Sequence, residues 1–198
     1  MLLERLRRFA ERPIAVERCD LCGRELDSEH SHIIEPAERR LVCVCGACAV
    51  LFDTSTTRKR VPRRVRLLAD FHITDALWDE LRLPIDLAFF VQSSVRGRPV
   101  ANYPSPAGAT ESLLPLEAWT EIVRANPILA SLEPDVEALL INRVGHTRGV
   151  APAEYFLAPI DQCFRLVGLI RTRWTGLSGG TEVWTAISGF FDDLRKRA

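Results

Sequence analysis

The sequence has no net charge, almost no lysine and no long apolar run. Its 198 residues carry 26 basic and 26 acidic side chains, which disfavours a protein that is basic over its whole surface. No stretch approaches the roughly 20 apolar residues that span a bilayer. The first residues, MLLERLRRFAERP, place Arg and Glu where a signal peptide needs an apolar core. We therefore expect a cytoplasmic protein without a membrane span.

An apolar fraction of 47% is typical of a globular protein with a sizeable core. Apolar residues at helical spacing predict five helices, with Thr74 and Thr181 as the N-caps of the second and the last. The predicted helices cover residues 2–11, 74–83, 114–126, 160–174 and a segment that begins at 181.

Short apolar runs predict strands at 66–73, 86–94 and 154–159, whereas 136–144 fits either a strand or a short helix. Residues 96–112 are rich in Pro and Gly and predict a loop with one short strand at 99–103. The pattern predicts an α+β fold, with a mixed sheet-and-helix domain over residues 56–198. An N-terminal helix and a cysteine-rich, zinc-ribbon-like module precede it over residues 1–55.

The chemistry of this sequence is concentrated in two cysteine motifs, CDLCG at residues 19–23 and CVCGAC at 43–48. A Cys-x-x-Cys pair forms a tight knuckle that directs two thiolates at one ion, and Gly23 permits the turn that follows. Two knuckles supply four ligands and close a tetrahedral site. Clustered cysteines in a reducing compartment favour metal ligation over disulfides. We predict one structural zinc ion held by Cys19, Cys22, Cys45 and Cys48.

Cys43 is a fifth cysteine that a tetrahedral site does not need. In an extended LVCVC segment Cys43 and Cys45 face the same side, so either could be the third ligand. We favour Cys45 because Cys45 and Cys48 repeat the knuckle spacing. His30 and His32 share a face if extended and are expected beside Cys43 across a hairpin. These three residues are either a second metal site or polar residues on the back of the module.

Two other metal-dependent functions are compatible with parts of the pattern. Iron in a rubredoxin-like site of four thiolates would make the chain an electron carrier, although the second motif lacks the Pro and trailing Gly expected there. The order of CxxC, His32-Ile-Ile-Glu-Pro36 and CxxC is also similar to the treble clef of HNH nucleases. That family needs an Asn and a further His, but no Asn lies between Pro36 and Cys45, and Ala49 follows the second motif.

The segment from Arg58 to Arg66 carries six basic residues and is expected to be an exposed connection. Such a run beside a zinc knuckle could contact phosphates. No aromatic residue interleaves with the basic ones to stack on bases, which disfavours nucleic acid as a partner. A basic face that docks an acidic protein partner is the alternative. No Ser-His-Asp or paired-carboxylate arrangement can be assembled from the sequence, which favours a non-enzymatic role.

Several motifs along the chain, from CDLCG and CVCGACAVLF to DLAFFVQSS, YPSPAGATES and PIDQCFRLVGLIRTRWTGLSGG, carry a resemblance. The chain resembles, over nearly its whole length, the bacterial domain-of-unknown-function family numbered 5947. Members occur near high-affinity, group 1h nickel-iron uptake hydrogenases. The resemblance implies an accessory role in assembly, maturation or electron wiring of such a hydrogenase. Together with the cysteine spacing, this predicts a non-enzymatic, zinc-binding accessory protein that acts through protein contacts. The sequence does not indicate an oligomeric state.

Overall fold

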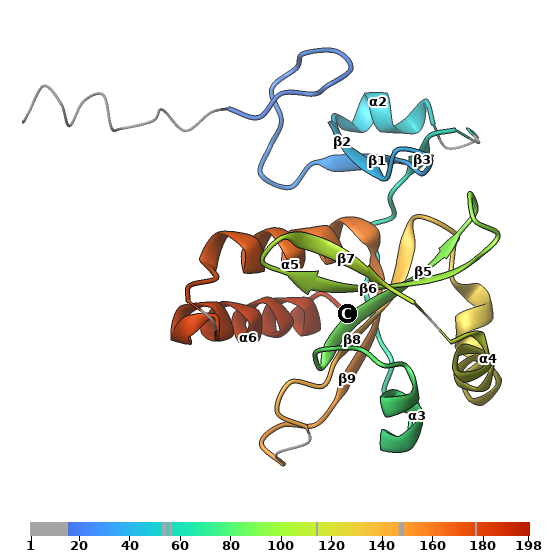
Figure 1. The fold of residues 1–198 in the computed structure, drawn as a ribbon. Helices are drawn as coiled ribbons and strands as arrows, with labels where there is room; N and C mark the ends of the chain where they lie inside the picture. Colours follow the sequence, from blue (N-terminus) through green and yellow to red (C-terminus); the bar gives the residue numbers. More distant parts are fainter. Residues whose placement is uncertain (1–15, 53–54, 56, 114, 147–148, 177) are drawn as a thin grey trace, which may run out of the picture.

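The computed structural model describes residues 16–52, 55, 57–113, 115–146, 149–176 and 178–198. The helix predicted at residues 2–11 lies outside these ranges. Among the described residues, no helix is long and apolar enough to cross a membrane. The chain forms an α+β structure in which a small cysteine-rich module lies above a larger domain of sheet and helices (Figure 1).

The cysteine-rich module is built around a three-stranded antiparallel sheet in the order β2-β1-β3. Its elements are β1 (Ser31–Glu35), β2 (Arg40–Val44), α2 (Gly46–Val50) and β3 (Lys59–Arg60). Side chains alternate across β1, so Ile33 faces the small core of the module and Ile34 joins the core of the larger domain. Strand β3 pairs with Ile33 and Ile34, so this sheet includes residues beyond the boundary expected at residue 55.

The larger domain contains a six-stranded antiparallel sheet in the order β4-β9-β8-β5-β6-β7. Its strands are β4 (Arg66–Leu67), β5 (Leu87–Ser93), β6 (Arg98–Ser105), β7 (Gly108–Ser112), β8 (Glu137–Asn142) and β9 (Glu154–Pro159). Its helices are α3 (Asp75–Glu80), α4 (Leu116–Ala125), η1 (Pro127–Ser131), α5 (Ile160–Arg173) and α6 (Gly180–Lys196).

Both faces of the larger sheet are covered by helices, which explains the continuous apolar run in β5. Leu87 and Phe89 pack with α5 and α6, whereas Ala88 and Phe90 pack with α3, α4 and η1. The helices lie on opposite sides of the sheet in Figure 1. A strand buried on both faces reads as uniformly apolar instead of alternating. The ambiguous segment 136–144 is such a strand, β8, at the centre of the sheet.

Three local predictions were wrong. The strand predicted at 99–103 lies within β6, but the rest of 96–112 is a hairpin of β6 and β7 and not a loop, because Pro99 and Pro104 lie toward the ends of β6 and leave its middle free to pair. The strand predicted over 66–73 ends at Leu67, where the chain turns and the N–H of Phe71 donates to Leu68 O (3.3 Å). Helix α6 begins at Gly180 with Gly179 as its N-cap, two residues before the predicted cap at Thr181.

Candidate metal centre

The first knuckle is a tight turn at the start of the module. The N–H of Gly23 donates to Cys19 O (2.8 Å), which folds Cys19 and Cys22 onto the same side of the turn. Gly23 has φ 73, a left-handed conformation that costs other residues about 1–2 kcal/mol. Arg18 and Glu25 form a bridge that closes the base of the turn. The role predicted for the glycine after the second cysteine is confirmed.

The second pair of cysteines lies where the hairpin leads into a helix. Strand β2 ends at Val44, Cys45 is the N-cap residue of α2, and Cys48 lies in the first turn of that helix. The N–H of Ala49 donates to Cys45 O (3.0 Å) and closes this turn. Along the chain the module thus consists of a knuckle, a hairpin and a short helix. Helix α2 (GACAV) contains neither His nor Asn.

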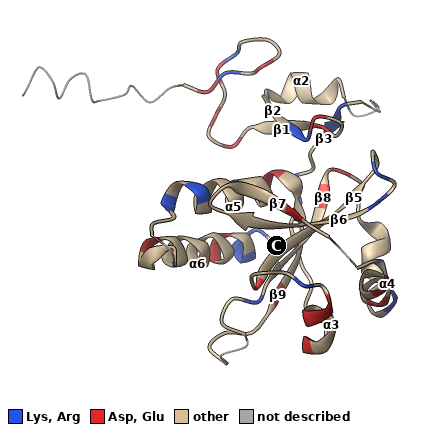
Figure 2. Ribbon diagram, viewed as in Figure 1, with Lys and Arg blue, Asp and Glu red and all other residues tan. Residues whose placement is uncertain are grey.

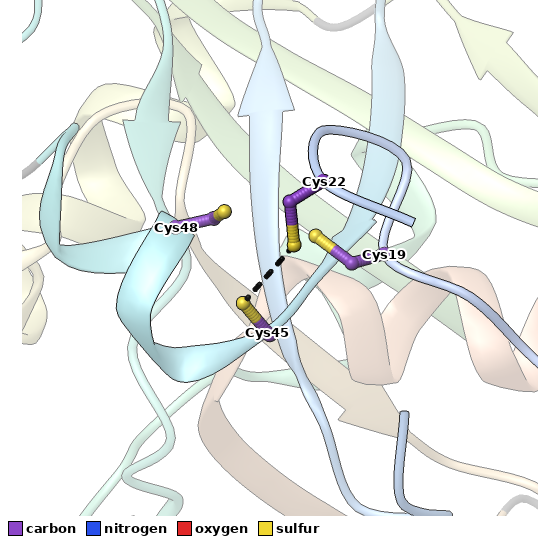
Figure 3. A group of neighbouring side chains, drawn as sticks. All are labelled: Cys19, Cys22, Cys45 and Cys48. Carbon is purple, nitrogen blue, oxygen red and sulfur yellow. Dashed lines mark hydrogen bonds between the residues drawn. The ribbon is translucent and has the colours of Figure 1, made fainter. Parts of the chain in front are cut away.

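The four cysteine sulfurs of residues 19, 22, 45 and 48 converge on one point (Figure 3). All four lie within 4.8 Å of one another, and Cys22 Sγ is 3.8 Å from Cys45 Sγ. A tetrahedral zinc ion with Zn–S bonds of about 2.3 Å separates its sulfur ligands by about 3.8 Å. The cluster therefore has dimensions that could hold one metal ion, and it is compatible with a zinc-ribbon-like module.

Backbone N–H groups favour ionisation of two of these thiols. Burial, the largest single influence, opposes ionisation of Cys19, but N–H groups of Cys45, Leu21 and Cys22 outweigh it and lower its pKa to about 6. The backbone of Cys48 likewise lowers the pKa of Cys45. The neighbouring sulfurs of Cys45 and Cys22 raise the pKa of Cys48 to about 12. Four thiolates this close repel one another, and a divalent cation removes that repulsion.

Cys43 and Cys45 do not face the same site, contrary to the expectation for an extended segment. The strand ends between them at Val44, and the turn into α2 carries Cys45 to the four-cysteine cluster. Cys43 stays in the strand, directly opposite His32 in the register of β1 and β2. Burial and the nearby Glu17 and Asp20 raise the pKa of its thiol. The structure thus brings Cys43 together with His30 and His32 as a second cluster.

The basic run is engaged in contacts within the molecule. Arg58 Nε donates to Glu35 Oε1 (2.6 Å), and Lys59 Nζ donates to Asp135 Oδ2 (2.6 Å). Arg63 donates to Glu29 O and Ser31 Oγ. Basic and acidic residues lie side by side at β1 and β3 in Figure 2. The segment is the connection that the sequence predicted, and Arg60, Arg63 and Arg64 in it are exposed, whereas Arg58 and Lys59 are half-buried and form ion pairs within the module and with the larger domain.

A cavity of about 540 Å³ lies apart from both clusters, between the β1–β2 turn and the larger sheet. Phe89, Val91 and Phe164 contribute apolar lining. Its charged residues are paired with neighbours, Arg39 with Glu111 at 3.3 Å and Asp135 with Lys59. These pairs leave the cavity without a convergent set of polar groups, so the candidate centre is at the cysteines.

Sequence reasoning missed the residues that surround the second cluster. Asp161, at the start of α5, accepts a hydrogen bond from His32 Nδ1 (2.9 Å) although 129 residues separate the two. Arg165 and Arg197 line the same cavity as the two histidines. A single Asp after Pro159 in the first turn of a helix is an ordinary helix-start residue. No local signal could have connected it with His32.

A family model described as "Family of unknown function (DUF5947)" matches residues 18–198. The chain belongs to this family. The matched residues begin just before the first knuckle. They include both cysteine pairs and every helix and strand among the described residues. Searches of curated proteins and of solved structures found no match. The description of the DUF5947 family assigns no function, so it carries no residue roles over to this chain.

Proposed function

We propose that this chain is a non-enzymatic, zinc-binding accessory protein that acts through protein contacts. Cys19, Cys22, Cys45 and Cys48 hold one structural zinc ion, and the ion fixes the module that meets the partner. The observation that carries the proposal is the convergence of four sulfurs, within 4.8 Å of one another, from a knuckle and a helix start. A site of four thiolates leaves no position for a reacting water, so the ion supports structure.

Zinc is preferred over iron because the site is built for a permanent structural ion. Its small core of Ile33, Val42, Val44 and Ala49 packs directly around Cys19 and Cys45, so the ion and the apolar residues stabilise the same unit. The grouping of four cysteines where one ion could bind supports the proposal of a reducing, cytoplasmic location, since such clusters there favour metal ligation over disulfides. An iron ion in the same four thiolates would instead make the chain a rubredoxin-like electron carrier.

The outer side of the module offers apolar side chains for a protein contact. Val50 and Leu51 follow the last cysteine and are 57% and 73% exposed. Leu21, inside the first knuckle, is 39% exposed. Helix α2 lies on the side of the module that faces away from the larger domain (Figure 1). Exposed apolar residues on a small rigid module are typical of a protein-binding surface.

The nature of the partner rests on the family. The resemblance to the DUF5947 family implies subunits of a group 1h nickel-iron hydrogenase, with assistance in assembly, maturation or electron wiring. Nucleic acid is disfavoured as the partner, because Arg58 and Lys59 form ion pairs with Glu35 and Asp135 and no aromatic residue interleaves with the basic run. Phosphate binding would have to break those contacts first.

Metal analysis of the purified full chain tests the zinc site. After dialysis against a mild chelator we expect one tightly bound zinc ion per chain and a colourless protein. Cys45→Ser should lose this ion, because a weaker donor replaces one of four thiolates, whereas Cys43→Ser should retain it. A red, iron-containing protein would favour the electron carrier. A metal-free chain with paired cysteines would overturn the proposal.

Co-purification tests the partner. The chain, expressed together with the subunits of a group 1h hydrogenase, should elute with one of them. Leu51→Glu should abolish this association, because it places a charge on the exposed apolar residue beside α2. The matched control is Val150→Glu, on an exposed residue (78%) of the larger domain, which should leave association intact. Elution of the wild-type chain without any subunit would contradict the hydrogenase assignment and leave the zinc site unaffected.

A further inference from the structure

The second cluster places three metal-ligating side chains on one face of the β1–β2 hairpin. One ligand atom from each of His30, His32 and Cys43 lies within 4.8 Å of the other two. His32 is directly opposite Cys43 in the register, and the rings of His30 and His32 are 4.6 Å apart at an interplanar angle of 54°. This cluster shares no residue with the four-cysteine site.

Hydrogen bonds fix which nitrogen of each histidine is available to a ligand. His30 Nδ1 lies 2.9 Å from Asp27 O, and a carbonyl oxygen only accepts, so Nδ1 carries the proton. His32 Nδ1 lies 2.9 Å from Asp161 Oδ2 and donates in the same way. In the neutral form of each ring, this tautomer leaves the lone pair of Nε2 free to bind a metal ion. A carboxylate that orients a histidine through Nδ1 is typical of metal sites.

His30 Nε2 provides an independent indication that a ligand belongs here. The side chain of His30 is 8% exposed, and Nε2 is buried with no hydrogen-bond partner in the part of the chain that the structure describes. A buried polar atom without a partner costs about 1–3 kcal/mol. Because Nδ1 is already engaged, this lone pair is satisfied only by a proton donor or a cation. A metal ion shared with His32 and Cys43 satisfies it.

The cluster opens on a cavity that is rich in arginine. The cavity has a volume of about 330 Å³, and its lining includes His30, His32, Arg63, Asp161, Arg165 and Arg197. Arg165 and Arg197 both donate to the neutral amide oxygen Oε1 of Gln162, at 3.3 and 3.1 Å. Asp161 Oδ2 accepts the hydrogen bond from His32 Nδ1, so the negative charge of this carboxylate lies beside the histidine. The lining carries the three guanidinium groups of Arg63, Arg165 and Arg197 against the two carboxylates of Glu29 and Asp161, so positive charge is in excess.

We propose that His30, His32 and Cys43 bind a second divalent transition-metal ion of the zinc class, whose open fourth position binds a small oxyanion in the arginine cavity. Two imidazoles and one thiolate are donors that suit zinc and its neighbours. Three protein ligands leave one tetrahedral position for an exogenous ligand. Arg63, Arg165 and Arg197 match the planar oxygen pairs of a carboxylate or a phosphate. The proposal goes beyond the structural zinc ion, although it requires the module to be folded.

Titration of the full-length, metal-depleted protein with Co²⁺ tests the ligands. We expect two equivalents to bind, the first with the thiolate charge-transfer absorption of a four-sulfur site and the second with weaker absorption. His32→Ala and Cys43→Ser should bind one equivalent and keep the four-sulfur spectrum. His72→Ala, a change at an exposed histidine of the larger domain, should still bind two. Binding of one equivalent by wild type, or of two by His32→Ala, would overturn the site.

Asp161→Asn provides a test that does not remove a ligand. Loss of this orienting carboxylate should lower the affinity for the second cobalt ion by about 10–100-fold and leave the affinity for the first unchanged. Circular dichroism checks that the variant is folded. Unchanged affinity for the second ion would show that Asp161 does not position His32 for a metal. Loss of the four-sulfur spectrum in wild type would instead indicate failure of the proposed zinc site, so the two failures are distinguishable.

Acetate and inorganic phosphate are the probes for the open position. Either anion should shift the d–d absorption of the second cobalt ion, whereas the four-sulfur ion, which has no open position, should not respond. The ratio of the two dissociation constants assigns the site to carboxylates or to phosphates. Arg165→Gln should lower the affinity for the anion by roughly tenfold, as expected for loss of one charge-assisted contact. No shift with either anion would mean that the position is closed, for example by Glu17, and would overturn the oxyanion site.

Discussion

Arg143 is a cation held almost completely inside the larger domain. Its side chain is 1% exposed, Nη2 donates to Asp75 Oδ1, and the guanidinium lies 5.1 Å from the centre of the Trp78 ring. Nε and Nη1 have no partner among the described residues. Hydrogen bonding from Arg143, the largest influence, lowers the pKa of Asp75 below its ordinary value of 3.8. A buried charge with one carboxylate partner depends strongly on that partner.

We predict that Asp75→Asn destabilises the larger domain at pH 7 and that the difference from wild type disappears in acid. Because the pKa of Asp75 is lower in the folded state, its contribution is complete above 3.8 and is lost as the pH falls through the folded-state value. Urea denaturation from pH 7 to pH 2.5 measures the difference. Asp70→Asn is the control, because Asp70 is an exposed carboxylate in the segment between β4 and α3. It should change the free energy of unfolding little. A difference that does not vary with pH would contradict the role of the ion pair.

Residues that act within one local segment could be predicted from the sequence. Thr74 caps α3 as predicted, with its side chain accepting from the N–H of Leu77, and Cys163 is fully buried on the inner face of α5. The two knuckles were visible because their spacing is local. Arg143 and Asp161 could not be assigned, since their partners come from other elements and only the tertiary fold brings them together. For the same reason, the sequence could not show that arginines lie beside the second cluster.

The turn between α5 and α6 depends on two glycines. Gly179 and Gly180 have φ 87 and 73, and Gly179 O accepts from the N–H of Thr175 at 3.2 Å. A Cβ atom at Gly179 would lie 2.8 Å from Val183 Cγ1 and 3.2 Å from the ring of Trp174. Gly179 and Gly180 therefore provide the backbone conformation with which the chain enters α6.

We predict that Gly179→Ala destabilises the chain by about 1–3 kcal/mol, since it combines a left-handed backbone with a clash. Gly168→Ala is the matched control, because Gly168 lies in α5 with no atom within 4 Å of the added Cβ. That change should stabilise the chain by about 0.5–1 kcal/mol. Thermal or urea denaturation of both variants measures the two effects. Equal effects from both substitutions would show that the turn imposes no special conformation.

Among the elements, the amphipathic helices could be predicted from the sequence, whereas the hairpin of β6 and β7 could not. The patterns of α4, α5 and α6 repeat every three to four residues and need no knowledge of the sheet. Strands β6 and β7 contain Pro99, Pro104 and Gly108, which locally favour a loop. Pairing of Val100 with Val91 and of Tyr103 with Thr110 outweighs that preference. The conformation of this segment is therefore determined by pairing with neighbouring strands, which its own local sequence does not indicate.

The module and the larger domain share contacts although each has its own core. Ile34 packs into the main core together with Val61 and Val65. Polar contacts supplement this packing, through Lys59 with Asp135 at 2.6 Å and Arg39 with Asn102 at 3.3 Å. Removal of the metal should therefore affect the junction as well as the module, and leave the helices that cover the sheet intact.

We predict that chelation unfolds the module and spares the larger domain. Structural zinc contributes on the order of 10 kcal/mol to its own module, whereas Phe89, Phe156 and Phe191 belong to a core far larger than the module. Hydrogen exchange with and without chelator should show loss of protection in β1, β2 and β3, with β5, β8 and β9 still protected. The Cys163→Ala chain serves as control, because it removes a thiol outside the metal sites. Loss of protection throughout the sheet would show that the molecule folds as a single unit.

The hydrogen bond between His32 and Asp161 spans 129 residues, and this sets an order of events during synthesis. Cys19 to Cys48 leave the ribosome early, so the module can capture its structural ion while the larger domain is still being translated. Asp161 emerges much later and can orient His32 only after β9 and α5 have been made. The second cluster thus acquires its orienting carboxylate only after the four-cysteine motifs, β9 and the start of α5 have all been synthesised.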